Sequence, residues 1–337
     1  YAPSYLSIYP QFFVHKDIDI ERINSLNDFS TLAVTQGSYF DHFLINQTLP
    51  YPRAHRFENN LQVVKAVESG TVEASLLPSI TVLLAEKIAP EASAGPRLPE
   101  PKPVSWALAK PVDPRISAQL DNFFIELRQQ QVLDQLLDRY FQHFERLDIA
   151  LTHRFLRDLD TRLQRYRKIF MEAADQYNLD WRLLAAMGYQ ESKWRADAVS
   201  EQQAQGIMQI VPRTGRSLGL DNPFDAAANI HAGARYIAQL RKHMDEQTPE
   251  PDRTYLALAA YNIGIGHLRD ALKLTEQQGG NPNSWPDVRQ RLPMMMEPEI
   301  YRLLTYGYAR GTETYNYVEN IRAFHDLMVW QETLKNH

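Results

Sequence analysis

The sequence contains no cysteine among its 337 residues. This absence excludes a disulfide framework and a thiolate metal site, whereas it is compatible with any compartment. No stretch approaches 18 consecutive apolar residues, so no segment of this sequence is expected to span a membrane. The P-loop and HExxH motifs are missing and the ten histidines are scattered, which argues against a nucleotide-dependent or metal-dependent enzyme. We therefore expect neither a cofactor nor a metal ion.

Basic residues are fewer than acidic ones. Lysine and arginine number 36 against 41 aspartates and glutamates, a net charge of -5. The sequence thus lacks a basic footprint, which argues against a nucleic-acid partner. A hydrophobic fraction of 44% and a charged fraction of 23% are ordinary for a globular protein. At this length two domains are the expected organisation. The chain begins at Tyr1 without a signal-peptide pattern, so we expect a mature or trimmed product.

The first 147 residues alternate between strand-like and helix-like patterns. Strands are expected at Ser4–Val14, Thr31–Thr35, Val72–Leu77 and Val104–Ala109. Helices are expected from Gly37-Ser38 through Phe43, and at Asn59–Ser69, Ile116–Arg128 and Val132–Phe144. Five prolines between Pro90 and Pro103 indicate a connection. This alternation predicts an α/β lobe with a largely parallel sheet over residues 1–147.

From residue 148 to 337 the pattern is helical throughout, which predicts an all-α second domain. One long amphipathic helix is expected to lead to Asp180, with an apolar stripe of Phe155, Leu159, Leu163, Tyr166, Phe170 and Tyr177. Asp180 is placed to cap a further helix that ends at Ser192. Two more helices are expected at Asp225–Met244 and at Thr254–Asn262, the latter ended by Gly264.

Glu191 is the candidate for acid–base chemistry. Leu184, Met187 and Glu191 are spaced three and four apart, so the carboxyl group shares a helical stripe with two apolar side chains. Apolar surroundings favour the neutral form of a carboxyl group, which a general acid needs near neutral pH. A single glutamate near a helix end is otherwise an ordinary solvated surface residue, and the residues alone leave that alternative open.

A glycosidic bond is cleaved with a proton donor and a group that stabilises an oxocarbenium-like transition state. Glu191 can donate the proton. The stretch that follows, Ser200–Gly206, is mostly polar and neutral, and Asp197 and Glu201 lie in sequence typical of an exposed loop. The sequence therefore offers no second carboxylate at the expected place.

Several blocks in order resemble one family. Glu191-Ser192, Ser200, Gly206–Gln209, Thr214 and Ala260–Gly264 are similar to the lytic transglycosylases of goose-type-lysozyme fold. The similarity continues through Asn281–Pro293, Thr305–Gly311 and Tyr317–Ile321. It covers essentially the whole chain, strongly from residue 148 onward and more weakly before it.

The resemblance implies a mechanism with one carboxyl group. Glu191 matches the family's sole acid/base, which protonates the oxygen between N-acetylmuramic acid and N-acetylglucosamine. The carboxylate then takes the proton of the muramoyl C6 hydroxyl, which attacks C1 of its own ring and leaves a 1,6-anhydro end. An intramolecular nucleophile makes a second carboxylate dispensable. The alternatives are a hydrolytic muramidase and a non-catalytic protein that binds or senses the cell wall.

The resemblance also implies roles for other residues. Ser200 matches a serine that contacts the muramic sugar, Gln209 a glutamine lining the cleft, and Met208 its apolar wall. Tyr261 and Asn262 match a pair at a helix end facing Glu191, and Glu313 matches an acidic residue near the substrate. Glycine is frequent in relatives where Gln203 stands. The expected partner is the peptidoglycan glycan strand, in the periplasm of a Gram-negative bacterium with peripheral outer-membrane association.

Residues 1–147 resemble the later part of a periplasmic solute-binding-protein domain that has a regulatory role in this family. The opening portion of its first lobe is expected to be absent from the sequence. Gly37-Ser38 at a helix N-terminus is a candidate site for a carboxylate, and a plain strand-to-helix turn is the alternative. A muropeptide or small peptide is the ligand to be tested there. The sequence reads Leu77-Pro78-Ser79 where amino-acid-binding relatives usually have an acidic residue.

Overall fold

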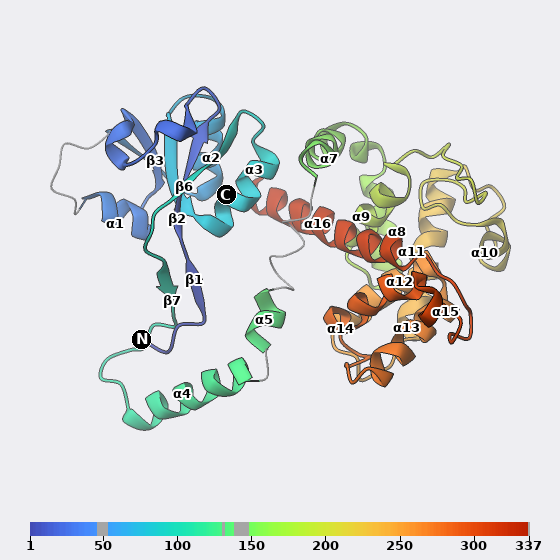
Figure 1. The fold of residues 1–337 in the computed structure, drawn as a ribbon. Helices are drawn as coiled ribbons and strands as arrows, with labels where there is room; N and C mark the ends of the chain where they lie inside the picture. Colours follow the sequence, from blue (N-terminus) through green and yellow to red (C-terminus); the bar gives the residue numbers. More distant parts are fainter. Residues whose placement is uncertain (46–52, 130–131, 138–147, 336–337) are drawn as a thin grey trace. The chain divides into compact units, whose positions relative to one another are not determined.

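The computed structural model describes residues 1–45, 53–129, 132–137 and 148–335 (Figure 1). Two compact units divide the chain, Tyr1–His153 and Arg154–His337. The first is an α/β unit and the second is helical, as the sequence predicts. The predicted domain boundary at residues 147/148 lies a few residues before this division and stays a prediction.

The first unit contains a five-stranded mixed sheet in the order β4-β3-β5-β2-β6. Its strands are β2 Pro10–His15, β3 Thr31–Thr35, β4 Arg53–Phe57, β5 Ala74–Pro78 and β6 Ala92–Arg97. β3 runs parallel to β4 and β5, whereas β2 is inserted antiparallel between β5 and β6. The expected largely parallel sheet is thus wrong at β2, whose five consecutive buried residues from Pro10 to Val14 fit a central strand of either direction.

The proline-rich stretch is not the predicted connection. It forms β6 and β7 Lys102–Val104, and β7 pairs antiparallel with β1 Leu6–Ile8 in a separate two-stranded sheet, drawn at one end of the larger sheet in Figure 1. Both strands lie at a sheet edge, where proline leaves no required hydrogen bond unmade. The predicted strand at Val104–Ala109 is correspondingly wrong beyond Val104.

Helices cover both faces of the larger sheet. They are α1 Tyr39–Ile45, α2 Asn60–Glu68 and α3 Ser79–Ile88. The unit also contains α4 Pro114–Gln129 and α5 Val132–Leu137. Phe13, on one face, joins a core with α2 and α3, whereas Phe12 and Val14 join a core with α1. This alternation follows from the two-residue period of a strand. The sequence missed α3 and β4, and the rest of the helix expected at Val132–Phe144 lies outside the described residues.

The second unit is a set of helices joined by turns and loops. They are α7 Ile149–Thr161, α8 Arg167–Tyr177, α9 Trp181–Ser192, α10 Pro212–Ser217, α11 Ala226–Lys242, α12 Asp252–Ile263, α13 Ile265–Gln277, α14 Trp285–Arg291, α15 Pro298–Tyr301 and α16 Gly311–Lys335, of which α7 begins before the division between the units. The longest of the loops connects α9 to α10. α9 packs against α8 and α16 and is buried along most of its length. No helix in the described part of the chain is both long enough and apolar enough to cross a bilayer.

The long helix expected before Asp180 is broken in two. A 3-10 turn at Leu163–Arg165 separates α7 from α8. The Gln164 side-chain amide donates to the Leu159 carbonyl at 3.1 Å, which satisfies a carbonyl near the end of α7. Leu163 stays buried through the break, so the apolar stripe that suggested one helix is preserved by two.

Candidate active site

Glu191 lies in the last turn of α9. Asp180 caps the start of this helix, as predicted, and its carboxylate accepts from the Arg182 N–H at 2.8 Å. Lys193 and Trp194 take the left-handed conformation, with φ of 56° and 55°, and end the helix directly after Ser192. The buried Trp194 indole donates to the Ala185 carbonyl at 2.8 Å, which folds the chain back onto α9. These contacts fix the end of α9, which carries the Glu191 side chain.

The Glu191 carboxyl group is partly buried and meets a tyrosine from α16. The Tyr317 hydroxyl donates to Glu191 Oε1 at 2.6 Å. Burial raises the pKa of Glu191 from 4.5 to about 7, although the Tyr317 hydrogen bond and the Lys193 charge act in the opposite direction. A carboxyl group with this pKa is available in both protonation states near neutral pH, so it can give a proton and take one back.

Two tyrosines accompany Glu191, the buried Tyr317 and the partly buried Tyr261. Burial, and then the Glu191 charge, raises the pKa values of Tyr261 and Tyr317 well above 10. Both phenols therefore remain neutral hydrogen-bond donors. The Tyr261 hydroxyl donates to the Met208 carbonyl at 2.9 Å, and its ring lies 5.1 Å from that of Tyr236. Tyr261 thus links the end of α12 to the loop that carries Met208 and Gln209.

Gly206 makes that loop possible. Its φ is +79°, and a Cβ there would lie 2.2 Å from the Pro223 carbonyl oxygen and 2.4 Å from Asn229 Nδ2. Asn229 is fully buried; it accepts from the Met208 N–H at 2.8 Å and donates to the Gln205 and Pro223 carbonyls. Glycine is therefore required here by both conformation and space.

The structure does not place Met208 as an apolar groove wall. Its side chain is fully buried, packed where Gly188 of α9 and Gly233 of α11 leave room for it. This differs from the expected substrate contact. Small residues on the two helices let a methionine fill the gap between them, and the Met208 carbonyl accepts the Tyr261 hydrogen bond.

Gln209 and Ser200 hold the same loop. Gln209 has φ of 48°, and its amide donates to the Gly206 and Ala198 carbonyls at 2.8 and 3.1 Å. The Ser200 hydroxyl oxygen accepts from the Ala204 N–H at 3.0 Å. Gln203 takes a left-handed φ of 63°, so the turn keeps the conformation that glycine would favour in spite of the side chain. Substrate contact by Gln209 and Ser200 stays a prediction.

Asn262 and Glu313 are placed by α16. Asn262 Oδ1 accepts from the Thr314 hydroxyl at 2.7 Å. Glu313 is exposed and lies 3.6 Å from Arg310. It precedes Tyr317 by four residues, so the two side chains share a helix face. The sequence did not identify Tyr317 as a site residue, because its contact with Glu191 joins positions 126 apart. The signal that could have identified it is its spacing of four residues from Glu313, which places both side chains on one helix face.

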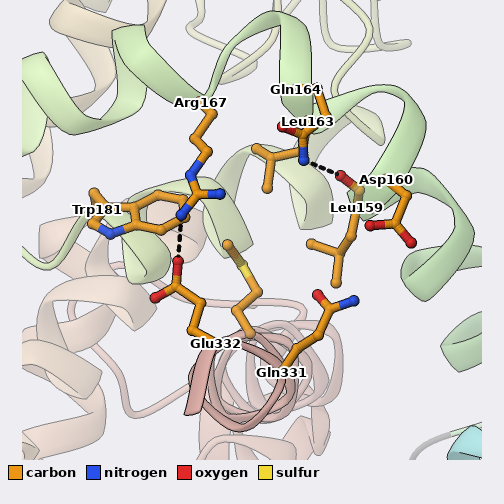
Figure 2. A pocket seen from close by; sticks show the side chains of 9 residues that line it. Leu159, Asp160, Leu163, Gln164, Arg167, Trp181, Gln331 and Glu332 are labelled. Atoms are coloured by element: carbon orange, nitrogen blue, oxygen red, sulfur yellow. Dashed lines mark hydrogen bonds and ion pairs between the residues drawn. The ribbon is translucent and has the colours of Figure 1, made fainter. Parts of the chain in front are cut away.

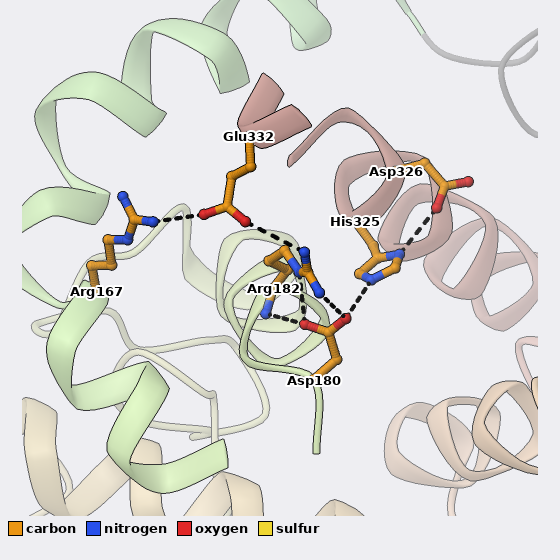
Figure 3. Close-up of polar contacts among 6 residues, drawn as sticks. All are labelled: Arg167, Asp180, Arg182, His325, Asp326 and Glu332. Atoms are coloured by element: carbon orange, nitrogen blue, oxygen red, sulfur yellow. Dashed lines mark hydrogen bonds and ion pairs between the residues drawn. The ribbon is translucent and has the colours of Figure 1, made fainter. Parts of the chain in front are cut away.

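The start of α9 is also bonded to α16. Asp180 Oδ2 lies 3.1 Å from His325 Nε2, and Arg182 contacts both Asp180 and Glu332 (Figure 3). His325 and Tyr317 meet opposite ends of α9, so the two helices run antiparallel with a polar contact at each end. Burial lowers the pKa of His325, but its contacts with Asp180 and Asp326 outweigh burial and raise it to about 9.

A small cavity lies beside this network, away from the acid. Figure 2 shows it between α7, α8 and the last turns of α16, with a volume of about 270 Å³. The Arg167 guanidinium lies 4.9 Å from the Trp181 ring centre and 2.6 Å from Glu332. Trp181 opens α9 and Glu191 is in its last turn, about 15 Å along the axis at 1.5 Å per residue. This cavity is therefore separate from the candidate active site.

In the first unit, the carboxylate site expected at Gly37-Ser38 is already filled by the chain itself. Asp41 is buried, accepts from the Gly37 N–H at 3.0 Å and pairs with Arg56 at 2.7 Å. The Gly37 hydrogen bond, against the effect of burial, lowers the pKa of Asp41. This contact contradicts the prediction that Gly37 binds an external carboxylate. Ser38 lines a largely apolar cavity of about 540 Å³ beside Tyr39 and Leu76.

Comparison with known proteins identifies the second unit. Residues 168–283 match the family model described as "Transglycosylase SLT domain". That span contains Glu191, the Gly206–Gln209 loop and Tyr261. The helical fold and this match define the second unit as a lytic-transglycosylase domain.

Curated relatives extend the match over most of the chain. The membrane-bound lytic murein transglycosylase F of Alcanivorax borkumensis is 35% identical over 94% of this chain and 68% of the relative. The corresponding proteins of Pseudomonas fluorescens and Stutzerimonas stutzeri are 35% and 34% identical, over 89% and 98% of this chain and 62% and 69% of theirs. The chain belongs to the family of membrane-bound lytic murein transglycosylase F, a family of enzymes.

Solved structures resemble a part of the chain. The ancestral amino-acid-binding protein AncCDT-1 is 21% identical over 42% of this chain and 61% of that one, with a TM-score of 0.36. A cysteine-binding protein from Campylobacter jejuni is 19% identical over 44% and 60%, with a TM-score of 0.38. These scores are too low to assign the first unit, so its solute-binding character stays a prediction.

Proposed function

We propose that Glu191 is the single acid/base in a non-hydrolytic cleavage of peptidoglycan. The bond is the β-1,4 link between N-acetylmuramic acid and N-acetylglucosamine, and the product carries a 1,6-anhydromuramoyl end. The observation that carries the proposal is a partly buried carboxyl group with a pKa of about 7 and a tyrosine hydroxyl 2.6 Å away. Membership of the transglycosylase family supplies the reaction class.

In the first step Glu191 gives its proton to the bridging oxygen as the bond from C1 to that oxygen breaks. The carboxylate that forms is stabilised by the Tyr317 hydroxyl. The C6 hydroxyl of the same muramoyl ring then attacks C1, and its proton returns to Glu191. Atoms and protons balance without water, and the acid is restored for the next turnover.

The described surroundings of Glu191 favour this route over hydrolysis. The groups that act on its charge there are Tyr317, Tyr261 and Lys193, none of which is a carboxylate. Most hydrolytic glycosidases use a second carboxylate to act as nucleophile or to activate water. An internal hydroxyl needs only correct placement. Ser200, Gln209, Asn262 and Glu313 are proposed to contact the sugars from the surrounding loop and helices.

Product analysis tests this function. Mass spectrometry of digested murein should show anhydro products, lighter by one water than those of a muramidase. The Glu191→Gln variant should lose roughly a thousand-fold in turnover, because its amide gives no proton. Glu201→Gln, at an exposed loop position, is the matched control and should keep its activity. Hydrated ends from the wild type, or an active Glu191→Gln variant, would contradict the proposal.

We also propose a periplasmic, membrane-associated location, as the name of the relatives suggests, with the outer membrane as the membrane concerned. In the first unit, the cavity at Ser38 is proposed to take a muropeptide or small peptide. Calorimetry of the chain with muropeptides and amino acids tests the latter. Absence of heat with all of them would count against a ligand there.

A further inference from the structure

Arginines gather in a groove beside the C-terminal end of α9. One cavity, of about 510 Å³, is lined by Arg154, Arg157, Asp158, Arg162, Lys193 and Arg195. A second, of about 360 Å³, shares Arg162 and Arg195 with the first and adds Arg165 and Asp197 to its lining. We call the two adjoining cavities the cationic groove, formed by Arg154, Arg157, Arg162, Arg165, Lys193 and Arg195.

The groove is positively charged, whereas the whole chain has a net charge of -5. Six cations face two carboxylates, and one of these is already engaged. Asp158 is buried, lies 3.7 Å from Arg162 and accepts from the Tyr189 hydroxyl at 3.3 Å. A concave surface lined by one sign of charge concentrates ions of the opposite sign.

The six cations of the groove differ in their hydrogen bonds and ion pairs. Arg162 and Arg195 donate to the Lys193 and Ser192 carbonyls, each at 3.2 Å. The exposed side chains of Arg154, Arg157 and Arg165, in contrast, make no hydrogen bond or ion pair with any other residue that the structure describes. Burial, together with the charge of Arg154, lowers the pKa of Lys193 to about 8. These features fit a site that gains from a bound anion.

The groove lies at the same end of α9 as the candidate acid. Lys193 lines it and follows Glu191 by two residues, and the two charges act on one another. An extended peptide of four residues reaches about 13 Å. A peptide attached to a sugar held at Glu191 can therefore reach into the groove.

We propose that the cationic groove binds the carboxylates of the peptides attached to the glycan strand. This inference rests on the proposed function, because it extends the substrate from the sugars at Glu191 to their side peptides. Guanidinium groups suit this role, since they pair with carboxylates through two parallel hydrogen bonds. A membrane surface fits less well, because none of the large apolar side chains exposed in the described residues lines either cavity.

Binding to murein sacculi tests the groove without turnover. In a Glu191→Gln background, co-sedimentation is measured with native sacculi and with sacculi whose carboxylates have been amidated. The parent should bind native sacculi about ten-fold more tightly, and low salt should widen the difference. The triple change Arg154→Gln, Arg157→Gln and Arg165→Gln should abolish this preference.

The matched control replaces three exposed lysines outside the groove, with Lys168→Gln, Lys242→Gln and Lys273→Gln. It has the same change in net charge and should keep the preference. Equal loss in both triple variants, or an unchanged preference in the groove variant, would overturn the proposal. So would groove-dependent binding to phosphatidylglycerol vesicles combined with unchanged binding to sacculi, since that outcome assigns the groove to a membrane. The failure of the proposed function would appear separately, as hydrated products of the active enzyme.

Discussion

At the scale of single residues, the hydrogen bond from the Tyr317 hydroxyl opposes the effect of burial on the pKa of Glu191. We predict that Tyr317→Phe shifts the alkaline limb of the pH profile of kcat/KM to higher pH. The hydrogen bond stabilises the carboxylate, so its loss raises the pKa of Glu191 above its present value of about 7. Turnover should fall about ten-fold, because the anion left after proton transfer loses its donor. Tyr177→Phe, at the end of α8, is the control and should leave the profile unchanged.

A profile for Tyr317→Phe that moves to lower pH would contradict this role. The sequence marks Glu191 as a candidate from its place on an apolar helical stripe, which is a local signal, and the resemblance to the family singles it out. It cannot predict Tyr317, since Tyr317 matters through a contact across the fold. The same limit explains why the sequence misplaced Met208 in the groove wall, because its burial depends on two glycines of neighbouring helices.

Gly206 offers a second prediction at this scale. Gly206→Ala should lower the free energy of unfolding by about 3 kcal/mol or more and reduce activity, because the new methyl group meets the Pro223 carbonyl and Asn229. Gly219→Ala is the matched control, with φ of +70° but no atom within 4 Å. It should lower the free energy of unfolding by only about 1 kcal/mol. Urea denaturation compares the two, and equal losses would show that strain alone accounts for both.

At the scale of elements, α9 and α16 form an antiparallel pair joined at both ends. The pKa of His325 is about 9, above its ordinary 6.5, so its contribution to stability is full below pH 6.5 and is lost as the pH rises through 9. We predict that His325→Asn lowers the free energy of unfolding by about 2 kcal/mol at pH 6, and that the difference from the wild type shrinks at pH 10. Denaturation at both pH values measures this. His243→Asn, at the exposed end of α11, should show no such change.

Elements with strong local signals were predicted best. Asp180 and Asp225 each begin a helix as N-caps, and the strand at Thr31–Thr35 has its expected bounds. The break between α7 and α8 was missed, because the apolar stripe continues through Leu163, and the turn is made by backbone hydrogen bonds and the Gln164 side chain, which leave no break in that stripe. The direction of β2 was also missed, since a strand buried on both faces has the same composition whichever way it runs.

At the scale of the whole molecule, each unit has a core of its own. Phe13 is fully buried in the first unit and Phe170 in the second. We predict that calorimetry resolves two unfolding transitions. Phe13→Ala should lower the free energy of unfolding of the first unit by about 3 to 5 kcal/mol, and Phe170→Ala that of the second unit by the same amount. The two variants control for one another. A single transition lowered equally by both would show that the units unfold together.

The polar contacts at both ends of α9 have a consequence for its backbone amides. A helix normally frays from its termini, so terminal amides exchange their hydrogens with solvent long before central ones. Here the Asp180–His325 contact holds one terminus and the Glu191–Tyr317 contact holds the other. Deuterium uptake along α9 should therefore be slow and nearly uniform, and the Glu191 side chain, the proposed proton donor, should keep its position for as long as the surrounding fold remains closed.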